Sequence, residues 1–189
     1  MKQVLLIGDS IRMGYCQEVK KQLSERAEVF YPDENCRSSQ NIMMSIALWA
    51  RLCEKQNVGV VYWNCGHWDA THFNGDPESL TSLSEYEKNL GAISGMLKRL
   101  FPNAKLVFAT TTPMNPTYPD GKSMRTTEEI MAYNDVAKRT FEGTDVLLDD
   151  LFAQTQGWGA EYYADYAHFT SEGSALLGKH VADVIAGLL

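Results

Sequence analysis

The sequence lacks three features that define large classes of protein: long apolar runs, clusters of basic residues and paired cysteines. No segment approaches the ~18 apolar residues of a membrane span. The formal charge is −7 at pH 7, and consecutive basic residues come in pairs at most, as in Lys20-Lys21. A protein that grips phosphate backbones presents clustered Lys and Arg. We therefore expect no membrane partner and no nucleic-acid partner.

A secretory leader is also missing from the sequence. The chain starts directly with a strand-like run, and no small-residue cleavage site follows an apolar stretch. This pattern favours a cytoplasmic location, unless a native leader precedes the sequence given.

The cysteines and histidines do not show the spacing of a metal site. The four cysteines are scattered, with no C-x-x-C pair: Cys16, Cys36, Cys53 and Cys65. This spacing predicts reduced, partly buried thiols rather than a zinc site. His67, Asp69 and His72 could be grouped as metal ligands, but their spacing is irregular and no fourth ligand is obvious. We expect no metal.

The composition that remains is that of a soluble globular protein, with 44% apolar and 22% charged residues. Short apolar runs alternate with longer amphipathic ones. Strands are predicted at 3–8, 27–31, 58–64, 105–111 and 145–148, and helices at about 12–26, 39–55, 84–101, 126–142 and 171–187. About five parallel strands joined by right-handed helical crossovers form a three-layer α/β/α sandwich, here as one domain over residues 1–189.

Helix start signals support two of these boundaries. Ser84 with Glu87 is predicted to form a capping box. Thr126 or Thr127 is predicted to cap the next helix, because glutamates follow in its first turn.

The position of polar residues after the strands predicts where chemistry takes place. In a parallel sheet of this kind, the site lies outside the carboxyl ends of the strands. The irregular stretches 65–83 and 112–125 both follow strands and are expected to wall the site. Gly8-Asp9-Ser10 follows the first strand, near the N-terminus of a helix, where backbone N–H groups favour developing negative charge. The alternative is that Asp9 or Ser10 only caps that helix.

A serine hydroxyl needs a base to become a nucleophile, and the base needs an orienting partner. Asp165 and His168 lie three residues apart just before the last helix. That spacing lets the carboxylate accept from one ring nitrogen while the other takes the proton of Ser10. The alternative is a capping aspartate and a surface histidine.

G-D-S after the first strand, together with D-x-x-H before the final helix, resembles the SGNH or GDSL-type esterase and lipase family, of which this chain would be a divergent member. The resemblance runs from the first strand to the last helix. It implies a flavodoxin-like sandwich and a Ser-His-Asp hydrolytic site, with Ser10 as the nucleophile, His168 as general base and acid, and Asp165 as its orienter.

Two of the family's motif blocks are altered here, and both concern the oxyanion hole. The second block lacks its glycine, so the resemblance leaves the backbone N–H of Cys36 or Arg37 as donor beside that of Ser10, with Asn35 donating from its side chain or shaping the turn. In the third block, Trp68 stands where the family has asparagine. Asn64 can donate from another angle, or it simply ends its strand.

The same blocks supply the candidate substrate-binding residues, which are Asp9, Asn35, Arg37, Gly66, His67 and Trp68. Arg12 and Arg37 could meet an anionic substrate, but solvated surface positions are the expectation for both. The loop after the first strand lacks the glycine pattern of a phosphate or dinucleotide site, so no cofactor is expected.

The resemblance implies a serine esterase that hydrolyses carboxylic esters through an acyl-enzyme. No lid helix or long apolar groove is evident in the sequence, which favours short acyl groups. By analogy with compact members of the family, the expected substrates are O-acetylated carbohydrates. The partner would be a small-molecule or oligosaccharide ester. The alternatives are a non-catalytic carbohydrate-binding relative, an acyltransferase with the same three residues, and a flavodoxin-like cofactor protein.

Overall fold

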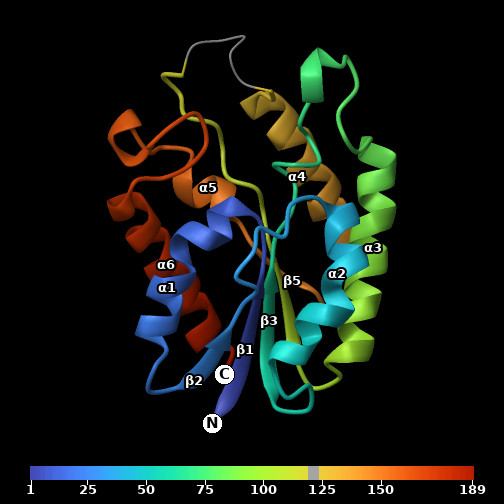
Figure 1. Ribbon diagram of the computed structural model, residues 1–189, viewed down its shortest axis with the longest axis vertical. Helices are drawn as coiled ribbons and strands as arrows, with labels where there is room; N and C mark the ends of the chain where they lie inside the picture. The colour runs from blue at the N-terminus through green and yellow to red at the C-terminus, as the bar shows by residue number, and fades with distance from the viewer. Residues whose placement is uncertain (119–123) are drawn as a thin grey trace.

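A computed structural model places five parallel strands in one sheet (Figure 1) and describes residues 1–118 and 124–189. The predicted loop 112–125 therefore lies partly outside the described residues. The strands are β1 (Lys2–Ile7), β2 (Ala27–Phe30), β3 (Val58–Trp63), β4 (Lys105–Ala109) and β5 (Leu147–Asp149), in the order β2-β1-β3-β4-β5. All four pairings are parallel. From β1 the chain continues to β2 on one side, and β3 then lies on the other side of β1. The loops after β1 and β3 therefore lead in opposite directions, and a crevice is expected between them at the carboxyl ends of these strands.

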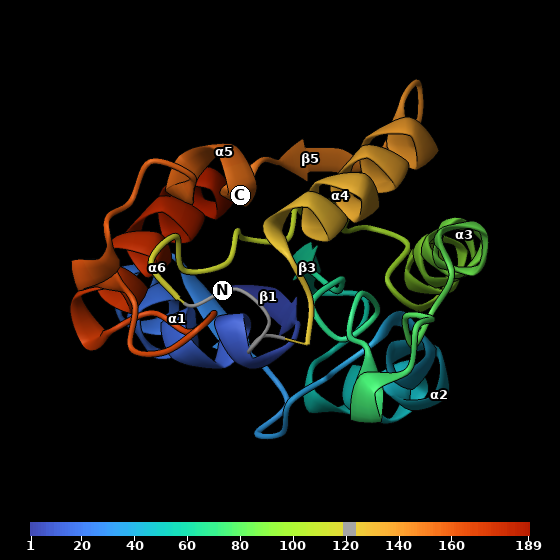
Figure 2. The same cartoon turned by 90° about the horizontal axis from the view of Figure 1, so that it is seen from above.

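Helices cover both faces of the sheet, which gives the three predicted layers (Figure 2). The longer helices are α1 (Ser10–Gln22), α2 (Ser39–Trp49), α3 (Leu83–Leu100), α4 (Thr127–Phe141) and α6 (Ser171–Ala186), with a short α5 (Leu151–Thr155). Single 3₁₀ turns occur at Ala50–Leu52, Phe73–Gly75 and Ala160–Tyr162. Helices α1 and α6 lie side by side on one face, and α2, α3 and α4 lie on the other (Figures 1 and 2).

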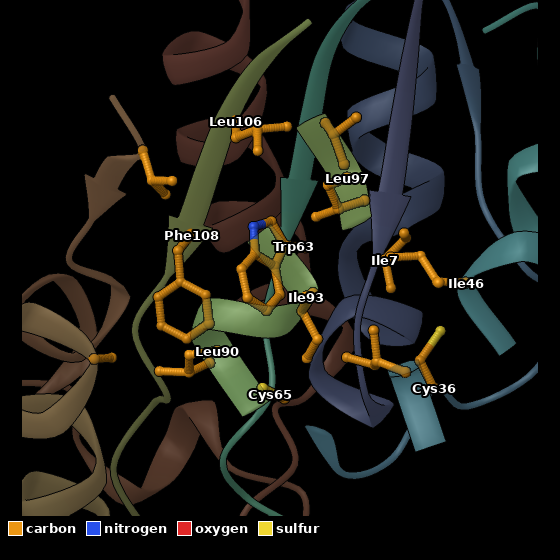
Figure 3. Packing of buried hydrophobic residues seen from close by; sticks show 14 of the residues in the cluster. Ile7, Cys36, Ile46, Trp63, Cys65, Leu90, Ile93, Leu97, Leu106 and Phe108 are labelled. Carbon is orange, nitrogen blue, oxygen red and sulfur yellow. The ribbon is translucent and has the colours of Figure 1, made fainter. Parts of the chain in front are cut away.

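On the three inner strands of the sheet, β1, β3 and β4, alternate side chains enter two separate cores. On β3, Val61 and Trp63 pack toward α2, α3 and α4, whereas Val60 and Tyr62 pack toward α1 and α6. Trp63 is fully buried, and its ring meets Phe108 edge-on with centroids 4.7 Å apart (Figure 3). Because both faces of the strands are covered, their sequences are continuous apolar runs, which is why they were recognisable.

The element boundaries differ from the predicted ones by a few residues, and one capping prediction is wrong. The capping box of α3 uses Ser82 and Glu85 rather than Ser84 and Glu87, because the helix begins at Leu83. Thr126 caps α4 as predicted, with Glu129 completing its capping box.

Two helices end earlier than predicted, and one was not predicted. α1 runs over Ser10–Gln22 rather than 12–26. The apolar spacing of 39–55 is divided between α2 and a 3₁₀ turn. α5 is too short to show a helical period in the sequence. Within the described residues, none of the helices is long and apolar enough to cross a bilayer.

Candidate active site

Ser10 begins helix α1, at the carboxyl end of strand β1, which lies between β2 and β3 in the sheet. Asp9 is the N-cap, and its side chain accepts from the Ile11 N–H at 3.0 Å. The capping alternative is therefore correct for Asp9, which is fully buried. Ser10 is the first helical residue, where the N–H groups of the helix end favour negative charge.

Gly8 connects β1 to α1 at a position that has no room for a side chain. A Cβ at this position would lie 2.0 Å from Asn64 Oδ1 and 2.7 Å from Arg12 Cβ. Glycine at this position allows Asn64 and Arg12 to pack directly against the backbone that precedes Asp9 and Ser10.

His168 and Asp165 meet Ser10 from the far end of the sequence. His168 Nε2 lies 2.7 Å from Ser10 Oγ, and His168 Nδ1 lies 2.7 Å from Asp165 Oδ2. Since the carboxylate accepts from Nδ1–H, Nε2 is left to accept the serine proton. Burial raises the pKa of Asp165, but the N–H groups of Ala167 and His168 and the imidazole itself outweigh it, and the pKa is lowered. Asp165 therefore stays ionised as the partner of the ring.

The loop that carries this pair is tied to the loop after β4. Asn115 donates from its backbone N–H to the Tyr166 carbonyl at 2.9 Å and from Nδ2 to the Asp165 carbonyl at 3.0 Å. The Ala164 N–H donates to the His168 carbonyl at 2.8 Å, which closes the loop on itself. Asn115 was not identified from the sequence, because its partners are 50 residues away.

A cavity of about 190 Å³ opens beside Ser10 and His168. Its walls come from the first residue of α1 and from four separate loops: Ser10, Asn35, Trp68, Thr71, Phe73, Met124, Arg125, Tyr166 and His168. Of the predicted substrate-binding residues, Asn35 and Trp68 line it. The combination of aromatic side chains with polar groups in these walls is typical of a small-molecule site.

Arg125 is a cavity residue that the sequence did not single out. It donates from Nε to His67 Nδ1 at 3.0 Å and from Nη1 to Thr71 Oγ1 at 2.7 Å. His67 lies behind it, only 2% exposed, with Nε2 3.2 Å from Thr112 Oγ1. Burial, reinforced by the Arg125 charge, lowers the pKa of His67 well below its ordinary value, so the ring is neutral. His67, a predicted substrate-binding residue, is not among the residues that line this cavity, and its ring accepts a hydrogen bond from Arg125.

Gly66 and Asp69 shape the loop after β3. Gly66 has φ = 143°, and a Cβ there would lie 2.1 Å from Thr111 Oγ1, so it serves the backbone and does not line the cavity. Asp69 accepts from the Ser39 N–H and from Ser39 Oγ at 2.5 Å, which ties the loop to the start of α2. Burial raises the pKa of Asp69 to about 6 despite these donors.

The altered motif blocks place their donors in unexpected ways. The Cys36 N–H donates to the Gly8 carbonyl at 3.1 Å, so the proposed oxyanion role for Cys36 conflicts with this hydrogen bond. The Arg37 N–H, at φ = 56°, donates to Asn35 Oδ1 at 2.8 Å. This bond engages the amide oxygen of Asn35, so Nδ2 is the end of the side chain that can donate to a ligand. Asn64 is 4% exposed and does not line the cavity.

The two arginines of the sequence analysis have different positions. Arg12 is 1% exposed, and its guanidinium donates to the carbonyls of Pro32 and Glu34, so its expected surface position is wrong. Arg37 is exposed as expected, outside the cavity, with its guanidinium 5.6 Å from the Trp68 ring centre.

His67, Asp69 and His72 do not gather around a common point. His72 binds the Asp76 carbonyl and Glu129, while His67 faces Arg125. Among the residues that the structure describes, no group of three His, Cys, Asp or Glu side chains is arranged to hold a metal ion.

The order of the parallel strands and the helices on both faces of the sheet define an α/β/α sandwich, and the solved structures to which the chain is similar share this fold. The chain is similar over 99% of its length to a lipase/acylhydrolase from Enterococcus faecalis, at 17% identity and a TM-score of 0.78, covering 96% of that chain. A carbohydrate acetylesterase from Sinorhizobium meliloti is similar at 15% identity and a TM-score of 0.76, and the match covers both chains fully. A GDSL-like lipase from Bacteroides thetaiotaomicron is similar at 12% identity and a TM-score of 0.75. The match covers 100% of this chain and 89% of that one.

These similarities confirm the predicted fold. No family model and no curated protein matches the sequence itself. The divergence from the solved structures lies in the sequence, since the arrangement of strands and helices is shared along nearly the whole chain.

Proposed function

We propose that the chain is a serine esterase of the SGNH type, which hydrolyses short-chain carboxylic esters through an acyl-enzyme. The observation that carries the proposal is the contact of Ser10 Oγ with His168 Nε2, and of His168 Nδ1 with Asp165, at the mouth of a cavity. The names of the similar structures, esterases and lipases among them, support the same reaction class.

The first half-reaction transfers the acyl group to the protein. Ser10 Oγ attacks the ester carbonyl carbon while His168 Nε2 takes the hydroxyl proton. Asp165 accepts from Nδ1–H and stabilises the imidazolium that forms. The C–O bond to the alcohol then breaks, and His168 returns its proton to the departing oxygen.

The second half-reaction releases the acid. A water loses a proton to His168 Nε2 and attacks the acyl carbon, and the Ser10 oxygen leaves with that proton. The Ser10 N–H at the first turn of α1 is one donor to the oxyanion. Asn35 Nδ2 is our candidate for the second, because Asn35 lines the cavity. Asn64 remains the alternative expected from the sequence.

The size of the cavity supports a short acyl group and a compact alcohol. A volume of about 190 Å³ is below the ~300–1,000 Å³ of sites for drug-sized ligands. The flat Trp68 and Tyr166 rings at its walls suit a ring-shaped alcohol, so acetylated carbohydrates are our proposed substrates.

The proposal is tested by hydrolysis of 4-nitrophenyl acetate with the Ser10→Ala variant. We expect turnover to fall by at least ~10³-fold with an unchanged circular dichroism spectrum, because Ser10 carries the hydroxyl that contacts His168 and no other described hydroxyl does so. Ser84→Ala, on the exposed first turn of α3, is the matched control and should keep full activity.

Labelling with a fluorophosphonate separates the proposal from its alternatives. Covalent modification at Ser10 requires an activated hydroxyl, so an unlabelled Ser10 would favour a binding protein. Labelling with acyl transfer to an added alcohol, faster than hydrolysis, would favour an acyltransferase. Full activity of Ser10→Ala would contradict the proposal.

A further inference from the structure

An open groove lies beside the cavity that contains Ser10 and His168. Its volume is about 320 Å³, and Trp68 and Phe73 line both the groove and the cavity. The centres of the two rings are 5.9 Å apart, so the rings form one shared wall. Both spaces open to solvent, and a ligand seated in the cavity can therefore continue into the groove over the rim of this wall.

The groove lies between the start of α2 and the loop after β3, which are next to one another (Figures 1 and 2). Gln40 and Asn41 belong to the first turn of α2, and Met44 follows one turn later. Leu80 comes from the loop. None of these four residues has a part in the proposed hydrolysis, so the groove adjoins the reacting groups without containing them.

Three polar side chains in the groove have groups left over for a ligand. The Arg37 guanidinium lies 5.6 Å from the Trp68 ring centre, but it has no hydrogen bond or ion pair within residues 1–118 and 124–189. The amide of Gln40 is half-buried and has no hydrogen bond in the same part of the chain. Asn41 donates from Nδ2 to the Cys36 carbonyl at 3.0 Å, which leaves its Oδ1 as an acceptor. The groove thus offers donors and acceptors together.

The mixture of side chains in the groove favours a ligand that carries hydroxyl groups. Four of the eight lining side chains are polar, and they lie beside the apolar Met44, Phe73 and Leu80. A long acyl chain would displace water from the polar groups without replacing their hydrogen bonds, which is unfavourable. A sugar ring can place its C–H groups on the apolar side chains and its hydroxyls on the polar ones.

We infer that the groove binds a second sugar unit, joined to the unit whose acetyl ester lies in the cavity. This inference rests on the proposed esterase function and narrows its substrate to acetylated oligosaccharides of two or more units. Cavity and groove together fall within the ~300–1,000 Å³ of sites for larger ligands. Because the second unit lies away from the scissile bond, its binding lowers KM and leaves kcat nearly unchanged.

The test compares a monosaccharide with its β-1,4-linked disaccharide as competitive inhibitors of 4-nitrophenyl acetate hydrolysis. Three series are measured: xylose, glucose and N-acetylglucosamine. In at least one of them we expect the inhibition constant to fall by ~10-fold from one unit to two, the effect of one or two neutral hydrogen bonds. If the protein does not hydrolyse the ester, calorimetric titration with the same sugars gives the same ratio.

A pair of glutamine variants separates recognition in the groove from a structural role. Gln40→Ala should weaken inhibition by the disaccharide by ~2–10-fold and leave inhibition by the monosaccharide unchanged. Gln17→Ala, which removes an exposed amide from the middle of α1 and lies outside both spaces, should keep the wild-type values for both sugars. Equal weakening of both sugars by Gln40→Ala would show a structural effect and overturn the inference.

Two other results would overturn the inference without the Gln40 variant, should that variant not fold. The first is an equal inhibition constant for one and two units in all three series. The second is that Leu80→Ala lowers kcat/KM for 4-nitrophenyl octanoate but leaves disaccharide inhibition unchanged, because the groove would then hold the acyl chain. Ser10-dependent hydrolysis of 4-nitrophenyl acetate would still support the esterase in both cases, so the two proposals fail separately.

Discussion

Two asparagine side chains compete for the second oxyanion donor. Asn35 lines the cavity, and its Oδ1 is held by the Arg37 N–H, which leaves Nδ2 as its other end. Asn64 lies against Gly8, and a hydrogen bond from its side chain helps to offset the burial that raises the pKa of Asp9. Asn64 thus has a structural role at the N-cap of α1, whereas the side chain of Asn35 has no hydrogen bond beyond its own turn within residues 1–118 and 124–189.

We expect Asn35→Ala to lower kcat by ~10²–10³-fold with little change in KM, because an oxyanion donor acts mainly in the transition state. Asn64→Ala is the matched comparison, measured on the same acetate ester. We expect it to lower the free energy of unfolding more than it lowers kcat. The reverse pattern, with Asn64→Ala inactive and Asn35→Ala active, would assign the donor to Asn64.

At the level of single residues, the sequence was informative where chemistry requires a particular residue type. Ser10, Asp165 and His168 were predicted together because a nucleophile, a base and a carboxylate are needed together, and each lies at a strand end or before the last helix. Arg125 and Asn115 were missed because arginine and asparagine are common in loops. Their partners, Thr71 and Asp165, are brought to them only by folding.

Helix α6 is joined to strand β5 by a buried polar contact. His180 Nε2 lies 2.9 Å from Asp149 Oδ1, and Tyr62 donates its hydroxyl to Asp149 Oδ2 at 2.6 Å. The hydrogen bond to Asp149 raises the pKa of His180 despite burial, and the charge of Asp183 adds to the increase. Charged His180 therefore stabilises the docking of α6.

This contact predicts a pH-dependent stability. The pKa of His180 is higher in the folded state than in the unfolded state. The contribution of charged His180 to the free energy of unfolding is therefore complete below the unfolded-state pKa of about 6.5, and it is lost as the pH rises through the folded-state pKa. In urea unfolding, we expect His180→Gln to be less stable than wild type at pH 6, and the difference to shrink at pH 8.5. Lys179→Gln, which loses only the exposed pair with Asp183, should differ from wild type equally at both values. A His180→Gln difference that does not vary with pH would show that the imidazole contributes only packing.

The helices and strands followed from local patterns, but their ends did not. The apolar runs of the strands and the capping threonine of α4 are local signals, and the structure agrees with them. The ends of α1 and α2 depend on which residues the neighbouring sheet and loops bury, and no sequence window contains that information.

Trp63 is the largest fully buried side chain among the described residues. It packs against Phe108 and Phe141, which joins β3, β4 and α4 in one cluster. Its indole N–H has no hydrogen-bond partner among the described residues.

We expect Trp63→Ala to lower the free energy of unfolding by about 3–5 kcal/mol, because it leaves a large cavity in the core. Trp63→Phe should cost less than half as much, since it keeps an aromatic ring and removes a buried donor that is itself unfavourable by ~1–3 kcal/mol. Urea unfolding measures both. An equal loss for the two variants would mean that indole volume alone decides the stability.

The sequence by itself determined the α/β/α layering, the number of strands and the three residues proposed for catalysis, because apolar periodicity and the chemistry of nucleophile and base are properties of short segments. The tertiary structure decided which side chains surround them. The cavity takes its walls from loops at positions 35, 68–73, 124–125 and 166–168, and these meet only because parallel strands bring their carboxyl ends to one edge of the sheet. The positive charge of Arg125 beside Ser10 is a consequence of that convergence.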